Sequence, residues 1–173
     1  MVTSGDNYLY YFKGTEEIQR TDGTNLSSIP IPTDTEDTYF MGVYTAGDKL
    51  YAVRASSQYQ QIKLYSYEQT AGWLMLKEFK APIYGDQEIE NFTAIGNKLF
   101  FNFRTDYENV APTDELWITD GSVSGTTLLK SFEWSPHFSG SEMGSFIDLS
   151  GTLFFRASNS SSKALWRSDG TSA

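Results

Sequence analysis

The stretch Asp114–Lys130, DELWITDGSVSGTTLLK, returns forty-nine residues later as Lys163–Ala173, KALWRSDGTSA. A fainter copy, Glu17–Ile29, EIQRTDGTNLSSI, lies near the start of the chain. The Asp-Gly pairs of the three stretches begin at residues 22, 120 and 169, so they are separated by ninety-eight and forty-nine residues. A period that holds across a chain indicates a repeat architecture.

The composition predicts that the repeated unit is built from β-strands. Aromatic residues make up 16% of the chain, and they lie in short apolar runs separated by Gly, Ser, Thr, Asp and Asn. Such runs are typical of short strands joined by tight turns. No segment shows a sustained apolar period of about 3.6 residues, so we expect an all-β fold with essentially no helix.

Each unit is predicted to contain four short strands. The second strand is the clearest, because glycine or asparagine turns precede it and its residues are nearly all apolar. The predicted second strands are Tyr8–Phe12, Lys49–Val53, Lys98–Phe103 and Thr152–Phe155. First strands are expected at 40–45, 91–95 and 144–149 with a remnant at 1–3, third strands at 17–20, 61–67, 115–118 and 164–167, and fourth strands at 26–31, 73–79 and 126–132.

Apolar residues on both faces of a strand indicate burial on both sides, as in sheets that stack face to face. Four-stranded antiparallel units of this length are typical of β-propeller blades, and a solenoid-like stack is the competing arrangement. We therefore expect one repeat domain over residues 1–173, with blades at approximately 1–31, 39–79, 90–132 and 144–173. These make about three and three-quarter repeats of roughly 49 residues, because the last blade lacks its fourth strand.

An incomplete last blade leaves three arrangements open. The chain is part of a larger ring, two chains complete one ring, or the two ends pair to close four blades. We favour the first. The open sheet edge also predicts edge-to-edge self-association, because an edge strand presents unpaired backbone groups.

The repeated motif is interpreted as a structural hairpin. Trp117 and Trp166 lie in third strands, where a large ring covers a neighbouring blade. The following turns are Asp120-Gly121 and Asp169-Gly170, in which aspartate accepts backbone N–H bonds and glycine supplies a positive φ. One aspartate per turn is too few for a calcium shell of six to eight oxygens, so we expect neither a metal site nor a cofactor.

Residues Glu115–Thr126 and Ala164–Ala173 resemble the repeats of the ELWxxDGT repeat proteins. The match also covers Gly151–Phe155 and Leu99–Phe101, whereas the first half of the chain follows only the strand pattern and TDGT at Thr21–Thr24. The resemblance implies propeller-type, hyalin-like repeats in an exported bacterial protein at the cell surface. It implies no particular activity, because the family has no agreed biochemical role. The turns are also similar to the structural Asp-box hairpins of sialidase propellers.

Charge and residue counts exclude several classes of function. The formal net charge is −9, which disfavours nucleic acid and anionic membranes as partners. There is no cysteine, and no apolar run reaches the roughly 20 residues that a membrane helix needs. The first residues lack the basic and apolar regions of a signal peptide, so we expect either that export is directed from elsewhere or, as we favour, that the chain is a piece of something longer.

A catalytic set is not evident. His137 is the only histidine and no nucleophile motif accompanies it. Arg54, Arg104 and Arg156 recur at the ends of second strands, and carboxylates are frequent in the inserts. A sialidase-like glycoside hydrolase of propeller type is therefore the alternative to a non-enzymatic protein.

Binding is the favoured function, and the inserts between strands are its predicted location. Residues 105–113 contain Tyr107, and residues 132–138 contain Trp134, His137 and Phe138. Aromatic rings beside polar groups suit a sugar ring or a peptide. We expect a scaffold or an adhesion module that binds a protein or a glycan.

Overall fold

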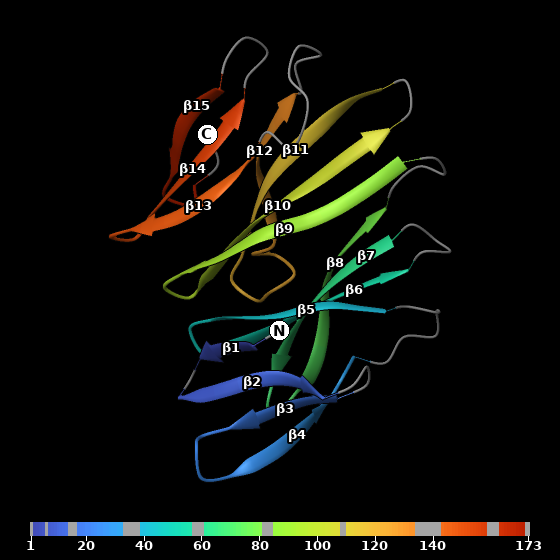
Figure 1. Ribbon diagram of the computed structural model, residues 1–173, viewed down its shortest axis with the longest axis vertical. Helices are drawn as coiled ribbons and strands as arrows, with labels where there is room; N and C mark the ends of the chain where they lie inside the picture. The colour runs from blue at the N-terminus through green and yellow to red at the C-terminus, as the bar shows by residue number, and fades with distance from the viewer. Residues whose placement is uncertain are drawn as a thin grey trace. The chain divides into compact units, whose positions relative to one another are not determined.

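The computed structural model describes residues 2–5, 7–13, 17–32, 39–56, 61–80, 85–107, 110–133, 143–158 and 163–171. All regular structure in these ranges is β-strand, which confirms the all-β part of the predicted fold. The strands form four antiparallel sheets, each a simple meander in which consecutive strands pair (Figure 1).

The bounds of the strands follow the predicted repeat. The first sheet contains β1 (Val2–Gly5), β2 (Tyr8–Lys13), β3 (Glu17–Thr21) and β4 (Leu26–Pro30). The second contains β5 (Tyr39–Ala46), β6 (Lys49–Ser56), β7 (Gln61–Glu68) and β8 (Gly72–Lys80). The third contains β9 (Gly85–Ile95), β10 (Lys98–Tyr107), β11 (Val110–Thr119) and β12 (Thr127–Glu133). The fourth contains β13 (Gly144–Leu149), β14 (Thr152–Ser158) and β15 (Lys163–Ser168).

A glycine with positive φ marks the turn between the third and fourth strands in every repeat. Gly23, Gly72, Gly121 and Gly170 have φ values of 91°, 80°, 87° and 86°, and they lie at intervals of forty-nine residues. In the second repeat this glycine begins β8 after a shorter turn, whose sequence, EQTAG, lacks the aspartate. The period therefore extends through a repeat in which the motif itself is lost.

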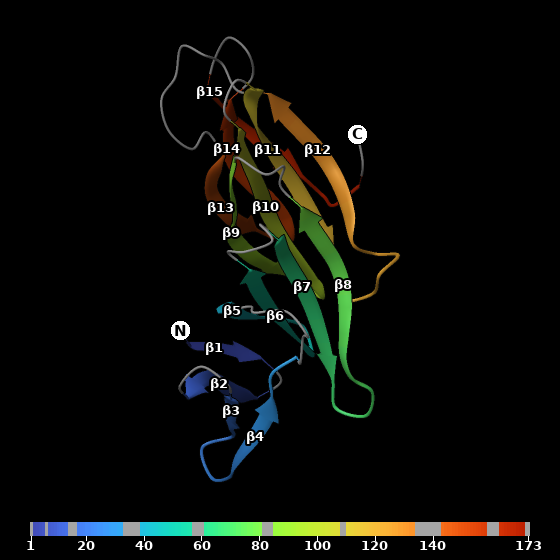
Figure 2. The same cartoon turned by 90° about the vertical axis from the view of Figure 1, so that its right-hand side faces the viewer.

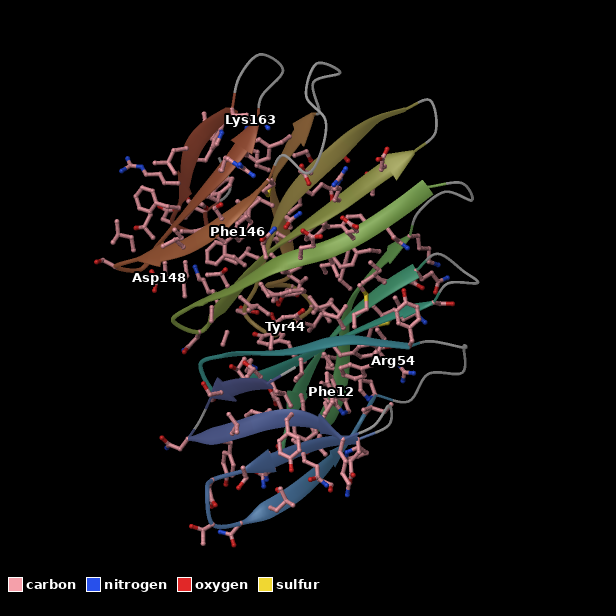
Figure 3. The ribbon with its side chains drawn as sticks, in the orientation of Figure 1. Phe12, Tyr44, Arg54, Phe146, Asp148 and Lys163 are labelled. Atoms are coloured by element: carbon pink, nitrogen blue, oxygen red, sulfur yellow. The ribbon has the colours of Figure 1, made fainter. Side chains whose placement is uncertain are left out.

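The chain forms two compact units. The first comprises Met1–Lys80 together with Gly121–Val123, and the second comprises Ala81–Asp120 together with Ser124–Ala173. In the first unit β1 lies beside β5, where Thr45 Oγ1 donates to the Ser4 carbonyl at 2.6 Å. Phe12 packs edge-on against Phe40 with ring centroids 4.1 Å apart (Figure 3). Apolar side chains of the first two sheets thus form one core.

The second unit repeats this stacking with its own core. Strand β9 lies beside β13 (Figures 1 and 2). Phe100 and Leu116 of the third sheet pack with Leu153 and Phe155 of the fourth sheet, and all four side chains are buried. Phe146, labelled in Figure 3, adds a ring 5.5 Å from that of Phe155. Apolar residues on the facing sides of two sheets hold this unit together.

The sequence prediction was wrong about one insert. Residues 104–113 were expected to form a variable loop, but β10 continues to Tyr107 and β11 begins at Val110. Polar cross-strand pairs extend this hairpin, since Thr105 and Thr113 hydroxyls lie 2.8 Å apart. Strand β9 likewise begins at Gly85, ahead of the first strand that was predicted at 91–95. Threonine pairs stabilise strands without the apolar pattern by which strands are recognised.

Candidate binding pocket

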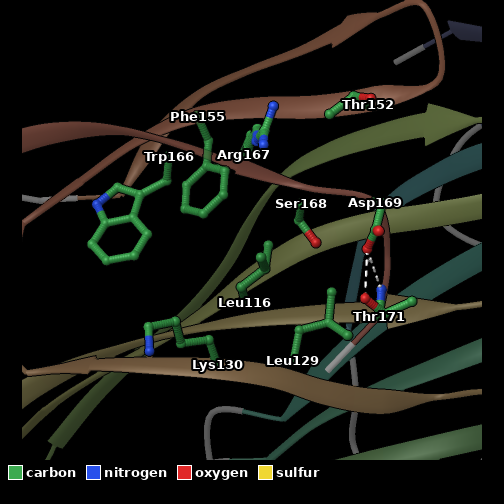
Figure 4. A pocket seen from close by; sticks show the side chains of 10 residues that line it. All are labelled: Leu116, Leu129, Lys130, Thr152, Phe155, Trp166, Arg167, Ser168, Asp169 and Thr171. Carbon is green, nitrogen blue, oxygen red and sulfur yellow. Dashed lines mark hydrogen bonds between the residues drawn. The ribbon is translucent and has the colours of Figure 1, made fainter. Parts of the chain in front are cut away.

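A pocket of about 460 Å³ lies within the second unit, between the third and fourth sheets (Figure 4). Ligand pockets usually have volumes of about 300–1,000 Å³, so this one is large enough for a side chain or a sugar ring. The lining residues come from β11, β12, β14 and β15 and from the turn after β15. They are Leu116, Leu129, Lys130, Thr152, Phe155, Trp166, Arg167, Ser168, Asp169 and Thr171.

Aromatic rings form the apolar wall of the pocket. Trp166 and Phe155 are directly opposite each other on β15 and β14, so they lie on the same face of the fourth sheet. Phe132 of β12 packs edge-on against both rings, at 5.1 Å from Trp166 and 5.9 Å from Phe155. The Lys130 ammonium lies 5.8 Å from the centre of the Trp166 ring, which is within the range of a cation–π contact.

The turn after β15 supplies the polar wall. Asp169 Oδ1 accepts bonds from the Thr171 backbone N–H at 2.9 Å and from the Thr171 hydroxyl at 2.6 Å. These bonds favour the ionised carboxyl and lower the pKa of Asp169. The Gly170 N–H donates to the Ser168 hydroxyl at 3.1 Å, which fixes the start of the turn. Asp169 thus caps its turn, and Gly121 and Gly170 both have positive φ values.

The edge of the fourth sheet explains why the pocket is open. The other three sheets have a fourth strand, whereas β15 is the last strand of its sheet among the residues that the structure describes. A strand beside β15 would carry alternate side chains on the face where Trp166 lies. The pocket is thus a space that a fourth strand would border.

The glycine of the motif allows the turn to approach the neighbouring sheet. A Cβ on Gly170 would lie 2.8 Å from Ile118 Cδ1 and 3.3 Å from the Phe100 ring. In the first unit Gly121 has a comparable place, because its carbonyl accepts a bond of 2.9 Å from the Ser66 hydroxyl. The two tryptophans of the motif are also packed: Trp117 is buried, and Trp166 contacts Phe132 of the neighbouring sheet. The glycines and tryptophans of the motif therefore pack against neighbouring residues in the described structure.

The same turn occurs in the first sheet, where it is exposed. Asp22 Oδ1 accepts the Thr24 and Asn25 backbone N–H groups at 2.8 and 2.6 Å, and Asp22 Oδ2 accepts Asn25 Nδ2 at 3.0 Å. The side chain of Asn25 is the largest cause of a pKa of about 2 for Asp22.

Asn25→Ala is expected to raise the pKa of Asp22 toward the usual value of about 3.9. Because its pKa is depressed, the ionised Asp22 carboxylate stabilises the folded turn. This contribution is fully present at pH values above the pKa of Asp22 in the unfolded chain, and it is lost as the pH falls through about 2. An NMR titration of the Asp22 carboxyl carbon measures the change. Asn97→Ala, in another exposed turn, is the control, and an unshifted Asp22 in Asn25→Ala would refute the assignment.

The predicted ligand-binding residues do not line the described pocket. Tyr107 lies at the end of β10 and its side chain is outside the described part of the chain, as are Trp134, His137 and Phe138. Lys130 and Phe155 were not predicted to bind a ligand, and Trp166 was predicted only to pack. The available signal was that no fourth strand follows Trp166 among the described residues, so that one side of this ring is uncovered.

Two of the three recurring arginines, Arg54 and Arg104, have local structural partners. Arg54 donates to the Pro32 carbonyl. Arg104 lies 3.9 Å from Glu88 and 3.8 Å from Asp106, counted between guanidinium nitrogen and carboxylate oxygen. Desolvation, followed by the nearby Glu88, raises the pKa of Glu90. In the interior of the second unit, Asp114 accepts the Met143 N–H at 3.3 Å, so this buried carboxylate joins the sheet to the segment before β13.

Within the described ranges, no group of three or more histidine or carboxylate side chains is placed to hold a metal ion. The part of the chain that the structure covers also contains no helix long and apolar enough to cross a membrane. A comparison with protein-family models finds no match, and a comparison with curated proteins finds none either.

Proposed function

We propose that this chain is a non-enzymatic binding module that takes an extended peptide strand along β15. The observation that carries the proposal is the open pocket beside the edge strand of a three-stranded sheet. Peptides commonly bind by adding a strand to such an edge, where backbone hydrogen bonds give affinity and side-chain pockets give specificity.

The repeat itself indicates the chemistry of the peptide. Strands β8 and β12 are both fourth strands, and the pairing of each with its third strand contains a β-bulge. The two strands share one sequence pattern, which reads Met75-Leu-Lys-Glu-Phe79 in β8 and Leu128-Leu-Lys-Ser-Phe132 in β12. Leu128 is opposite Trp117 in the third sheet. Because Trp166 corresponds to Trp117 after forty-nine residues, the first apolar residue of the peptide is placed opposite Trp166, facing the pocket. The expected ligand is therefore two apolar residues followed by lysine, any residue and phenylalanine.

A labelled peptide copying Thr126–Phe132 (TTLLKSF) tests the proposal by fluorescence anisotropy. We expect binding that weakens about tenfold or more when the peptide carries Leu128→Ser, because one buried apolar side chain contributes about 1.5–3 kcal/mol. Trp166→Ala in the protein should weaken binding similarly. Trp73→Ala, a tryptophan change in the first unit, is the control. Equal affinity for the two peptides would refute the proposal.

A sugar ring is the second candidate ligand. Trp166 offers a face for stacking, and Ser168, Asp169 and Lys130 border the same pocket with hydrogen-bonding groups. A glycan array read against wild type and Trp166→Ala tests this candidate. Retention of a sugar that depends on Trp166 supports it, and no retention of any sugar excludes it.

Three broader expectations belong to the same proposal. They are a propeller arrangement of the sheets, membership of the ELWxxDGT repeat family and a place at the bacterial cell surface. Four antiparallel meanders and the Leu-Trp-x-x-Asp-Gly motifs support the first two. The third follows from the resemblance alone, and labelling of intact cells with an antibody against this domain tests it.

A further inference from the structure

The free face of the fourth sheet exposes a leucine that is buried at the same place in other sheets. Ile18, Leu116 and Leu165 are separated by ninety-eight and forty-nine residues and lie on third strands. Ile18 and Leu116 are 0 and 2% exposed, whereas Leu165 is 75% exposed. In each unit the buried residue lies on the face that packs on the following sheet. Leu165 therefore lies on a face built for a following sheet.

The first sheet has the complementary free face. The second residue of the second strand is leucine in all four sheets, that is in β2, β6, β10 and β14. Leu50 and Leu153 are 2 and 0% exposed and face the preceding sheet of their unit, but Leu9 is 43% exposed. We call the free face of the first sheet, which carries Leu9 and Leu26, the trailing face. We call the free face of the fourth sheet, which carries Phe154 and Leu165, the leading face.

The Asp22-Gly23 turn of the first sheet resembles the Asp169-Gly170 turn, which packs on the third sheet within the second unit. In both turns the aspartate accepts the N–H two residues on, and the glycine N–H donates to the hydroxyl before the aspartate. Gly170 packs on Ile118 and Phe100, whereas no described atom lies within 4 Å of a Cβ built on Gly23. The trailing face thus carries a preformed turn whose glycine has no described atom packed against it.

Charge on the two faces is complementary. Arg156 and Arg167 are exposed on the leading face, as neighbours of Leu165 and Phe154. On the trailing side Asp22 has a pKa of about 2 and is ionised at neutral pH. Glu17 and Lys13 share the face of Leu9 and pair with each other at 3.9 Å, so Asp22 is the acidic group of this side whose charge no described lysine on the same face offsets. Opposite charges at the rim of an apolar contact orient two partners.

We propose that the leading face of one chain packs on the trailing face of a second copy, head to tail. This contact between two chains has the same sheet-on-sheet packing that each unit contains. Asp22-Gly23 of the second copy packs on the leading face of the first copy in the way that Asp169-Gly170 packs on the third sheet. The contact differs from pairing of strand edges, because it uses sheet faces and leaves β15 accessible. A head-to-tail contact joins two different surfaces, so it closes into a ring or continues into longer assemblies.

Sedimentation equilibrium of three single variants over a wide concentration series tests the proposal. Wild type is expected to associate, and Leu165→Glu and Leu9→Glu are each expected to remain monomeric. Val123→Glu adds the same charge at an exposed apolar residue outside both faces, and it should associate like wild type. Leu26→Glu is a second change on the trailing face, at a residue of the edge strand β4, in case Leu9→Glu fails to fold.

Mixing the variants gives the sharper result. Leu165→Glu keeps an intact trailing face and Leu9→Glu keeps an intact leading face, so their mixture should form a one-to-one dimer. The double variant should not associate with either itself or wild-type chains beyond background. A wild type that stays monomeric at all concentrations would overturn the proposal, as would single variants whose mixture stays monomeric. Association of Leu165→Glu alone would overturn it as well.

Discussion

Phe155→Ala is expected to lower the free energy of unfolding by about 3–5 kcal/mol, as usual for a buried phenylalanine. The ring is 2% exposed and contacts Phe132 and Phe146, which come from two different sheets. Its removal leaves a cavity between the two sheets of the second unit. The lost packing is not recovered, because the surrounding structure closes such a cavity only in part.

Phe154→Ala is the matched control for this change. Phe154 is the preceding residue of β14, and because strands alternate it points to the opposite, leading face, where it is partly exposed. We expect a cost of about 1 kcal/mol, since less apolar area is lost from contact. Urea unfolding followed by NMR signals of the second unit measures both. Equal costs for the two alanines would contradict the assignment of the buried face.

Gly170→Ala is expected to cost about 2–4 kcal/mol, the sum of two effects. The residue has a φ of 86°, which any side chain with a Cβ disfavours. The added Cβ would also lie 2.8 Å from Ile118 Cδ1, so the turn or the buried isoleucine must move. The second effect is specific to docking of the turn on the third sheet.

Gly151→Ala separates the two effects, because Gly151 also has a φ of 86° but no described atom within 4 Å of an added Cβ. It should cost only the conformational part, about 1 kcal/mol. Thermal unfolding of the two variants under identical conditions provides the comparison. A Gly151→Ala that is as unstable as Gly170→Ala would show that the close approach contributes nothing.

Much of the fold could be predicted from the sequence because a few local rules repeat. Short aromatic strands, tight turns and the forty-nine-residue period together predict four meanders and a last sheet of three strands. Gly72 lies in a turn that lacks the aspartate of the motif, yet the forty-nine-residue period alone identifies it as the equivalent of Gly121.

The hairpin at 105–113 and the pocket could not be predicted for different physical reasons. Polar cross-strand pairs such as Thr105 and Thr113 extend strands without an apolar signal. The pocket is present because of the strands and side chains that surround Trp166. Those surroundings depend on which strand is the last of the sheet. Leu116 and Leu165 show the same dependence on surroundings. They occupy equivalent positions of the repeat, yet Leu116 is buried and Leu165 is exposed because their neighbours differ.

The edge of β15 can be measured directly by hydrogen exchange of the alternate backbone amides of Ala164–Ser168 that point away from β14. The account predicts rapid exchange of these amides in the chain alone and strong protection when the TTLLKSF peptide is added, with the β4 amides unchanged. Protection of the β15 amides before the peptide is added, or exchange that the peptide leaves unaltered, would contradict an open edge that accepts a strand.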